Sequence, residues 1–151
     1  MPDVVIADTS CLIILSNINE LDLLKKVYNT ITTTPDIALE FAETLPDWVI
    51  IKSPKDHQKQ QILELQIDKG EASAITLALE IPGSTIILDD LQARILADRL
   101  GILITGTIGV IIRAKLNGVI PSIKPLLNKI KQTNFRISAA LESIALKEAG
   151  E

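Results

Sequence analysis

Acidic side chains stand directly after two short apolar segments of this sequence. Asp8 follows Val-Val-Ile-Ala, and Asp89 and Asp90 follow Thr-Ile-Ile-Leu. Short β-branched runs of this kind are typical of buried parallel strands. Because sites in open parallel sheets lie beyond the carboxyl ends of the strands, we expect these three carboxylates in one crevice. An aspartate after a strand also caps helices, so Asp8 and Asp90 could each serve as an N-cap instead.

Glu71 begins a patterned helix that we predict from Glu71 to Glu80. At about 100° per residue, Glu71 falls within the buried stripe that Ile75 and Ala78 define. Glu80 points away from that stripe. A carboxylate on a core-facing side is costly unless it is paired or binds a cation, so Glu71 is a candidate ligand.

Glu40 lies in a second predicted helix. Its start is marked by Thr34 to Asp36, which supply a capping hydroxyl, a proline in the first turn and an acid at the positive end of the dipole. The apolar positions that we expect this helix to bury are Ile37, Phe41 and Leu45. Glu40 lies at the edge of that face. Solvated surface is the alternative for either glutamate, and a site requires several acids to converge.

Carboxylates gathered in one crevice repel each other, so they either bind protons or hold a hard cation. The chain has one Cys and one His, too few for a zinc site of the usual ligands or an internal disulfide. Oxygen ligands favour Mg²⁺ or Mn²⁺. Such a metal can activate water and neutralise charge on a phosphodiester. We therefore expect the oxygens of the four acidic positions close to one shared point.

The net charge of −4 conceals an asymmetry along the chain. Residues 1–90 carry six Lys and fifteen acids, a net of −9, and residues 91–151 carry nine basic and four acidic residues, a net of +5. The candidate phosphate contacts in the basic half are Arg94, Arg113, Lys115 and Thr107. Thr107 ends a Thr-Gly-Thr turn whose N–H groups could take a phosphate, or which could be an ordinary strand-to-helix turn. The asymmetry suggests that the acidic half carries out chemistry on an anionic ligand that the basic half binds.

Strands alternate with helices along the chain and predict an α/β domain, a three-layer sandwich with a central parallel sheet of four or five strands. The expected strands span 4–7, 30–34, 48–51, 85–88 and 102–104. The expected helices start at 10, 20, 35, 55, 71, 91, 107, 122 and 138. The helix over 55–67 is polar, and His57 is expected on its surface. We expect one domain over residues 1–151, with the helices from about 122 onward packed on it.

Several function classes are disfavoured by composition. The sequence is 47% hydrophobic and 3% aromatic, so its core must be aliphatic and it offers few rings for stacking bases. The longest apolar run, Cys11 to Leu15, is far short of the ~20 residues of a membrane helix. The start of the chain lacks the basic and apolar regions of a signal peptide. We expect a cytoplasmic protein.

The order of these motifs resembles the PIN-domain family of small metal-dependent ribonucleases, many of them toxins of toxin–antitoxin pairs. The resemblance runs from Asp3 to about Gly118, through Asp8-Thr-Ser, Thr-Pro-Asp-Ile-Ala-Leu-Glu40, Gly70-Glu71-Ala and Ile-Ile-Leu-Asp89-Asp90. The continuation Asp-Leu-Gln-Ala-Arg94 and the segment around Gly106 are similar to a PIN-like branch described only as predicted nucleic-acid-binding proteins.

The resemblance implies a role for each matched position. Asp8, Glu40, Glu71 and one of Asp89 and Asp90 match the four acids of the site. Of these, Asp8, Glu71 and the Asp89-Asp90 pair are the implied metal ligands. Thr9 and Ser10 would orient Asp8 or a metal-bound water. The sequence departs from the family pattern in having Glu71 where Asp is common, and Leu88 two positions before Asp90 where threonine is common.

The leading hypothesis is a Mg²⁺- or Mn²⁺-dependent ribonuclease that cuts single-stranded RNA. The resemblance also implies an antitoxin bound over this face and a homodimer, since PIN domains often dimerise. The alternative is a catalytically weak or inactive domain that binds RNA or a protein partner. A metal-dependent phosphatase on small substrates is a third hypothesis.

Overall fold

Five short strands form one parallel sheet in the computed structural model, which describes residues 3–151. The strand order is β3-β2-β1-β4-β5. The bounds are β1 Val5–Ala7, β2 Ile31–Thr33, β3 Val49–Ile51, β4 Thr85–Ile87 and β5 Leu103–Thr105. Ile6 illustrates the parallel pairing, with Thr32 on one side and Ile86 on the other. The predicted central parallel sheet is therefore confirmed.

The connectivity creates a switch point in the middle of the sheet. From β1 the chain adds β2 and then β3, and the next crossover returns past both to place β4 on the free side of β1. Open parallel sheets bind ligands where the strand order reverses in this way, beyond the carboxyl ends of the strands. Asp8 directly follows β1 and Asp89 follows β4 by two residues. The fold thus places the first and last acidic motifs beside the switch point.

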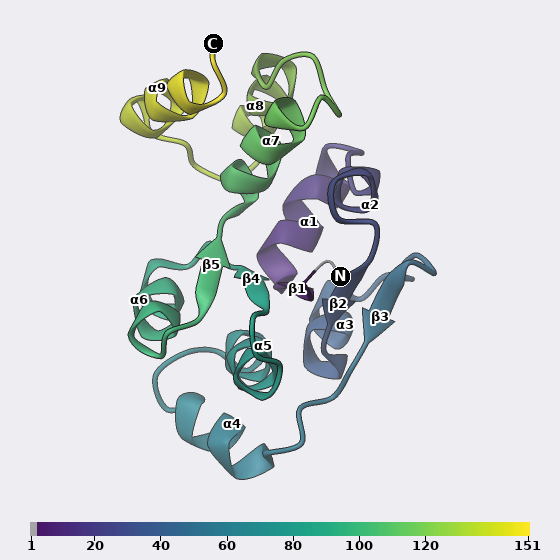
Figure 1. Cartoon of the computed structure of the whole chain (residues 1–151), viewed down its shortest axis with the longest axis vertical. Helices are drawn as coiled ribbons and strands as arrows, with labels where there is room; N and C mark the ends of the chain where they lie inside the picture. Colours follow the sequence, from purple (N-terminus) through teal and green to yellow (C-terminus); the bar gives the residue numbers. More distant parts are fainter. Residues whose placement is uncertain (1–2) are drawn as a thin grey trace.

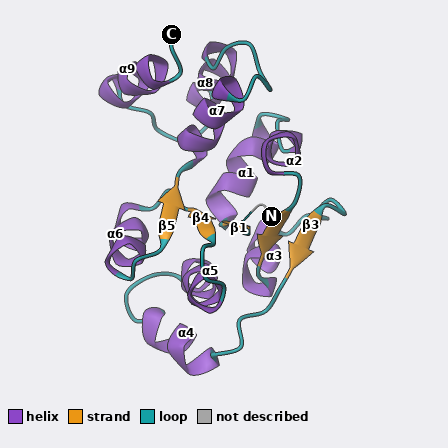
Figure 2. Cartoon of the chain, in the orientation of Figure 1, coloured by secondary structure: helices purple, strands orange, loops and turns teal. Residues whose placement is uncertain are grey.

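Helices cover both faces of the sheet and make the predicted three-layer sandwich (Figures 1 and 2). On one side lie α1 (Thr9–Asn17), α2 (Asp22–Tyr28) and α7 (Thr107–Leu116). On the other, α5 (Lys69–Glu80) packs on β1 and β4 and contacts α3 (Pro35–Phe41) and α4 (His57–Leu63). α6 (Leu91–Arg99) packs on β5. α8 (Lys124–Lys131) and α9 (Ala139–Glu148) lie beside α7.

The core is aliphatic, as the composition predicts, and α5 runs through its centre. Every residue of α5 from Gly70 to Ala78 is buried. Its small residues, among them Ala72 and Ala74, let the helix approach the sheet closely, while Ile75 and Leu77 fill the core. The same run includes Glu71, which is therefore buried together with its apolar neighbours.

The end of α3 differs from the prediction. The helix stops at Phe41, and Ala42 adopts the left-handed conformation with φ of 61°. Leu45 therefore lies outside the helix and is only partly buried. Pro46 explains the early end, because a proline disfavours a helical conformation at the preceding residue and clashes with the carbonyl four residues before it.

The other predicted elements are present with ends shifted by a few residues. The largest difference is α4, predicted over 55–67 and observed over His57–Leu63, since Asp56 caps its start through a bond from Lys59 N. No helix within residues 3–151 has both the length and the apolar content needed to cross a membrane.

Candidate acidic site at the carboxyl edge of the sheet

Asp8 lies at the end of β1 and is buried, with 4% of its surface exposed. It occupies the N-cap position of α1, but its side chain makes no capping hydrogen bond. Asp8 is therefore the N-cap residue by position, with its carbonyl accepting from Leu12 N, but its carboxylate does not cap the helix. Burial raises the pKa of Asp8 to about 7, and the carboxylates of Glu71, Asp68 and Glu40 add to this rise, which a hydrogen bond from the Thr9 backbone only partly offsets. The charged groups that act on this pKa are all carboxylates, so the position is suited to a cation.

Glu40 rests on the backbone of Gly70. A Cβ added to Gly70 would overlap Glu40 Oε1 and would lie 3.0 Å from Glu40 Cδ and 3.4 Å from Thr9 Oγ1. The missing side chain of Gly70 thus opens the space in which the Glu40 carboxylate sits beside Thr9. Burial, followed by the charge of Asp68, raises the pKa of Glu40. The start of α5 therefore positions a glutamate that belongs to α3.

Glu71 and Asp68 form a capping box at the start of α5. Asp68 Oδ1 accepts a bond from Glu71 N (2.8 Å), and Glu71 Oε1 accepts one from Asp68 N (3.2 Å). Glu71 is 8% exposed. Its burial, and then the charges of Asp68, Asp90 and Glu40, raise its pKa to about 7. Asp68 is absent from the residues predicted from the sequence, although the Asp-x-x-Glu spacing before an apolar run is a known signature of this cap.

The neighbouring residues Asp89 and Asp90 point to different partners. Asp89 Oδ2 accepts bonds from Ser10 Oγ (3.1 Å) and Thr107 Oγ1 (2.5 Å), and Oδ1 accepts one from Thr107 N (2.8 Å). Asp90 Oδ2 accepts from Ala93 N (3.0 Å) and caps α6, as the N-cap alternative expected. The charge of Asp90 also contributes to the raised pKa of Glu71.

The carboxylates of the site raise one another's pKa values, but their side chains do not form a complete set of metal ligands. Within residues 3–151, no three Asp, Glu, His or Cys side chains are already placed to hold one metal ion. The expected convergence on a single point is therefore wrong for this conformation. The reason is local: the capping box holds Glu71 and hydrogen bonds from Ser10 and Thr107 hold Asp89.

Three features of this region nevertheless fit a hard divalent cation. The donors are carboxylate oxygens whose raised pKa values report burial and mutual repulsion. Gly70 leaves the Glu40 carboxylate its space. Thr9 Oγ1 is buried without a hydrogen bond of normal geometry, although it lies beside Glu40 and lowers that pKa slightly. A cation with oxygen ligands would use all three features.

The basic residues predicted to hold phosphate are scattered. Arg94 Nη1 donates to Leu88 O (2.7 Å) beside the acidic edge. Thr107 is fully buried, and its N–H and hydroxyl both donate to the carboxylate of Asp89 rather than to a phosphate.

The other two basic candidates lie away from the acids. Lys115 Nζ lies 3.2 Å from Ala149 O and 3.4 Å from Glu151 Oε2, at the far end of α7. Arg113 lines a cavity with Val5 and Thr85, which start their strands. The fold brings Arg94 to the acids, but not Arg113 or Lys115.

The raised pKa values predict that the metal-free protein loses stability between pH 5 and pH 8. A carboxyl group whose pKa rises from 3.8 unfolded to about 7 folded keeps its proton in the folded state, so its contribution to stability is largest at low pH and is lost as the pH rises to about 7. We expect a loss of about 2 kcal/mol, or on the order of 5 °C in the melting temperature. Thermal denaturation in EDTA measures it.

Added Mn²⁺ should restore more stability at pH 8 than at pH 5, because ligands must lose their protons before they bind a metal. A melting temperature that rises from pH 5 to pH 8 in EDTA would contradict this prediction.

A family model described as a PIN domain matches residues 4–151. The match includes all five strands and every acidic residue of the site. No curated protein and no solved structure matches the chain significantly.

Proposed function

The chain belongs to the PIN-domain family, and from that premise we propose that it is a divalent-metal-dependent ribonuclease that hydrolyses single-stranded RNA. PIN domains are generally nucleases that bind nucleic acid and use divalent metals, which supports a nuclease-type activity here. The observation that carries the proposal is the buried Asp8 at the switch point of the sheet, where the charged groups acting on its pKa are all carboxylates.

Asp8, Glu71 and Asp90 are the residues that we assign to a Mg²⁺ or Mn²⁺ ion, with Glu40 beside them. Asp90 is preferred to Asp89 as the fourth acid because its charge acts on Glu71, whereas both oxygens of Asp89 already accept hydrogen bonds. A divalent ion bound here would supply an activated water and would neutralise charge on the phosphodiester.

The other residues act by positioning these carboxylates. Gly70 leaves room for Glu40, and the buried hydroxyl of Thr9 lies beside that carboxylate. Ser10 and Thr107 hold Asp89, which ties the start of α1 to the start of α7 across the end of β4. Arg94 lies next to this link, near Gly106, where it can face a phosphate oxygen of the substrate.

A protein partner at this edge, such as an antitoxin, is supported by an apolar cavity of about 470 Å³ beside Asp89 and Arg94. α6, α7 and α9 line it. Leu91 at its margin is 71% exposed and Ile144 is 54% exposed, so the cavity and its margin present apolar surface that a protein partner would cover.

The second candidate function is a PIN domain that binds RNA or protein without cutting. It is favoured by one observation, the absence within residues 3–151 of three side chains already placed on one metal ion. Under that hypothesis the capping box and the Asp89 hydrogen bonds serve stability alone.

Incubation of the pure protein with end-labelled single-stranded RNA decides between the two. We expect cleavage with Mn²⁺ or Mg²⁺ and none with excess EDTA. Intact RNA that still shifts on a native gel would favour the binding domain. Turnover of a phosphomonoester with RNA left intact would instead favour a phosphatase.

A further inference from the structure

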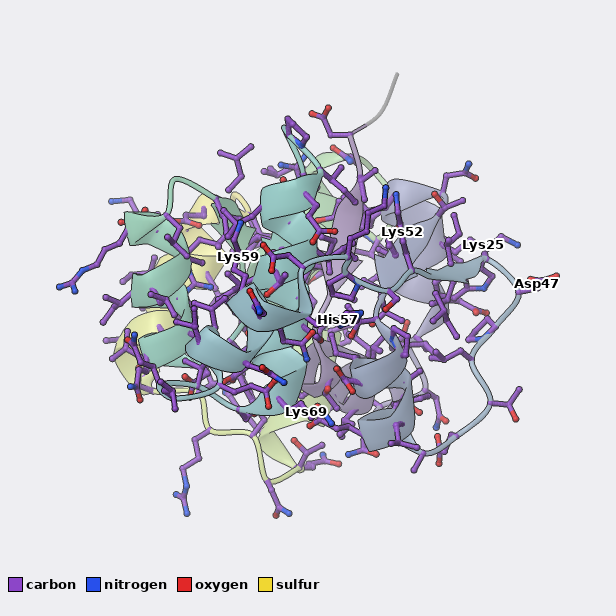
Figure 3. The ribbon with its side chains drawn as sticks, turned by 90° about the horizontal axis from the view of Figure 1, so that it is seen from below. Lys25, Asp47, Lys52, His57, Lys59 and Lys69 are labelled. Carbon is purple, nitrogen blue, oxygen red and sulfur yellow. The ribbon has the colours of Figure 1, made fainter. Side chains whose placement is uncertain are left out.

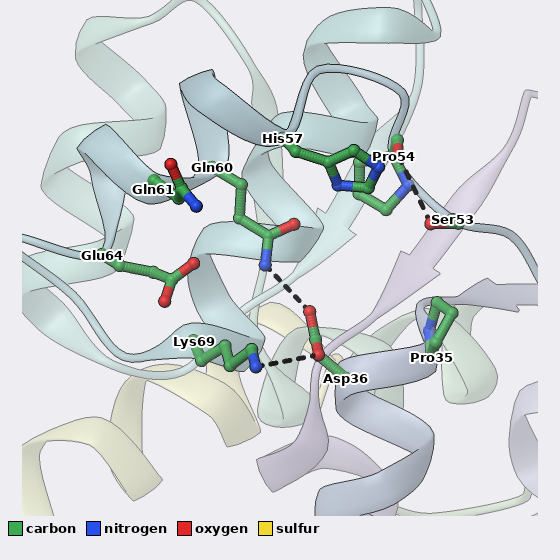
Figure 4. A pocket seen from close by; sticks show the side chains of 9 residues that line it. All are labelled: Pro35, Asp36, Ser53, Pro54, His57, Gln60, Gln61, Glu64 and Lys69. Atoms are coloured by element: carbon green, nitrogen blue, oxygen red, sulfur yellow. Dashed lines mark hydrogen bonds and ion pairs between the residues drawn. The ribbon is translucent and has the colours of Figure 1, made fainter.

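A separate cavity of about 340 Å³ lies next to the acidic site, where the starts of α3, α4 and α5 meet the segment after β3 (Figure 4). The rings of Pro35, Pro54 and His57 line one part of it. Polar side chains, among them Asp36 and Lys69, line the rest. Its volume lies at the lower end of the range for small-molecule sites.

The polar part of this cavity is held in place by its own contacts. Gln60 Nε2 donates to Asp36 Oδ2 (2.8 Å), and Lys69 Nζ lies 3.7 Å from Asp36 Oδ1 (Figure 4). Gln60 is 7% exposed although it belongs to a polar helix. Asp36 takes one N–H of the Gln60 amide, so the second N–H and the carbonyl oxygen remain for a ligand. Glu64, the residue that follows the end of α4, adds an exposed carboxylate to the lining.

We propose that this cavity binds a guanine base of the RNA strand, with His57 against the face of the ring and the carboxylates of Asp36 and Glu64 at its donor edge. The proposal rests on the ribonuclease function and names a base that the site selects. Single-stranded RNA is commonly read in this way, by stacking unpaired bases on flat side chains and bonding their edges.

The charges of the lining favour a base over a phosphate. Two carboxylates face the cavity, and the ammonium of Lys69 is already paired with Asp36. A phosphate would meet net negative charge there. A neutral base would not, and its N–H groups would donate to the carboxylate oxygens.

The acceptors also favour guanine over uracil and adenine. Guanine presents a ring N–H and an adjacent amino group, which match the two oxygens of a carboxylate. Its neighbouring carbonyl oxygen needs a donor, and Lys69 supplies one beside Asp36. Uracil has one N–H between two carbonyl oxygens and would place acceptors against the carboxylates. Adenine has no ring N–H on that edge.

The cavity adjoins the acidic site through two shared elements. Asp36 precedes Glu40 on α3 by four residues, about one helical turn, and Lys69 adjoins Gly70, which supports Glu40. Figure 3 shows Lys52 and Lys59 on the same face of the molecule as His57, outside the cavity lining, where phosphates on either side of the base would meet them. These lysines belong to the half of the chain with net negative charge.

Titration of nucleoside monophosphates in EDTA tests the proposal without any cleavage. His57 is the only histidine of the chain, so its imidazole protons give their own NMR signals. We expect GMP to shift them and to bind at least about fivefold more tightly than UMP or AMP. The substitution His57→Ala should weaken GMP binding in calorimetry by about tenfold, the usual loss for one stacking contact.

Two further variants serve as controls for the role of the His57 ring. His57→Phe should restore most of the GMP affinity, because it keeps a flat ring, and Gln58→Ala, next along the exposed side of α4, should match the wild type. Equal binding of the four nucleotides, no binding, or displacement of GMP by inorganic phosphate at the same concentration would overturn the proposal.

The cleavage assay separates this inference from the function on which it rests. If RNA is cut in a metal-dependent way but His57→Ala cuts the same positions as the wild type, the guanine site is wrong and the ribonuclease stands. If GMP binds through His57 and RNA is never cut, the ribonuclease is wrong and the guanine site stands.

Discussion

Replacing Asp8 with Asn should lower metal-dependent RNA cleavage by at least about 100-fold and at the same time stabilise the metal-free protein at pH 8. The first effect follows because the substitution removes the carboxylate at the switch point that we assign to the metal. The second follows because burial raises the pKa of Asp8 to about 7, so its ionised form destabilises the folded state at pH 8. An amide of the same shape has no charge to bury.

The opposite signs of the two effects make this result specific. A variant that had merely unfolded would lose activity and stability together. Asp3→Asn is the matched control, since Asp3 is exposed and precedes β1 at the other edge of the sheet. It should change neither cleavage nor melting temperature. Unchanged cleavage in Asp8→Asn would remove the metal site from this part of the molecule.

Replacing Gly70 with Ala should lower cleavage about tenfold or more while leaving the fold intact. The new Cβ would overlap Glu40 Oε1, the free end of a flexible side chain, so Glu40 would turn away rather than disrupt α5. Within residues 3–151, four glycines have a positive φ, and Gly70 is not one of them. Alanine can therefore adopt the backbone conformation of Gly70. Alanine also favours a helix by up to about 1 kcal/mol.

A double-mutant cycle tests this cause. In a Glu40→Ala background the clash has no partner, so Gly70→Ala should have no further effect on cleavage and should raise the melting temperature. If Gly70→Ala lowers cleavage as strongly without Glu40 as with it, the glycine acts through something other than the position of this carboxylate.

The order and class of the elements could be read from the sequence because they depend on local patterns. The β-branched runs before Asp8 and Asp89 became the neighbouring central strands β1 and β4. Thr34 caps α3 through Ile37 N, as its position before proline predicts. Burial of Glu71 followed from helical periodicity alone. Each of these results depends on residues within a few positions of one another.

Side-chain partners were decided only by the tertiary structure, because they join residues distant in sequence. Asp89 and Asp90 are adjacent in the chain, yet Asp89 binds Ser10 and Thr107 while Asp90 caps α6 through Ala93 N and its charge raises the pKa of Glu71. The total charge of the basic half indicated phosphate contacts, but α7 carries Lys115 away from the acidic edge to Ala149 and Glu151.

The surroundings of His57 were also decided only by the tertiary structure. In the sequence it is one polar residue among lysines and glutamines, and its exposed position was predicted correctly. Only the packing of α4 against α5, with the start of α3 close by, encloses it with Pro35, Asp36 and Lys69 in one cavity. The sequence determined which groups are present and on which elements they lie. The packing of those elements decided which groups meet, because a side-chain contact depends on two backbone paths that no local pattern specifies together.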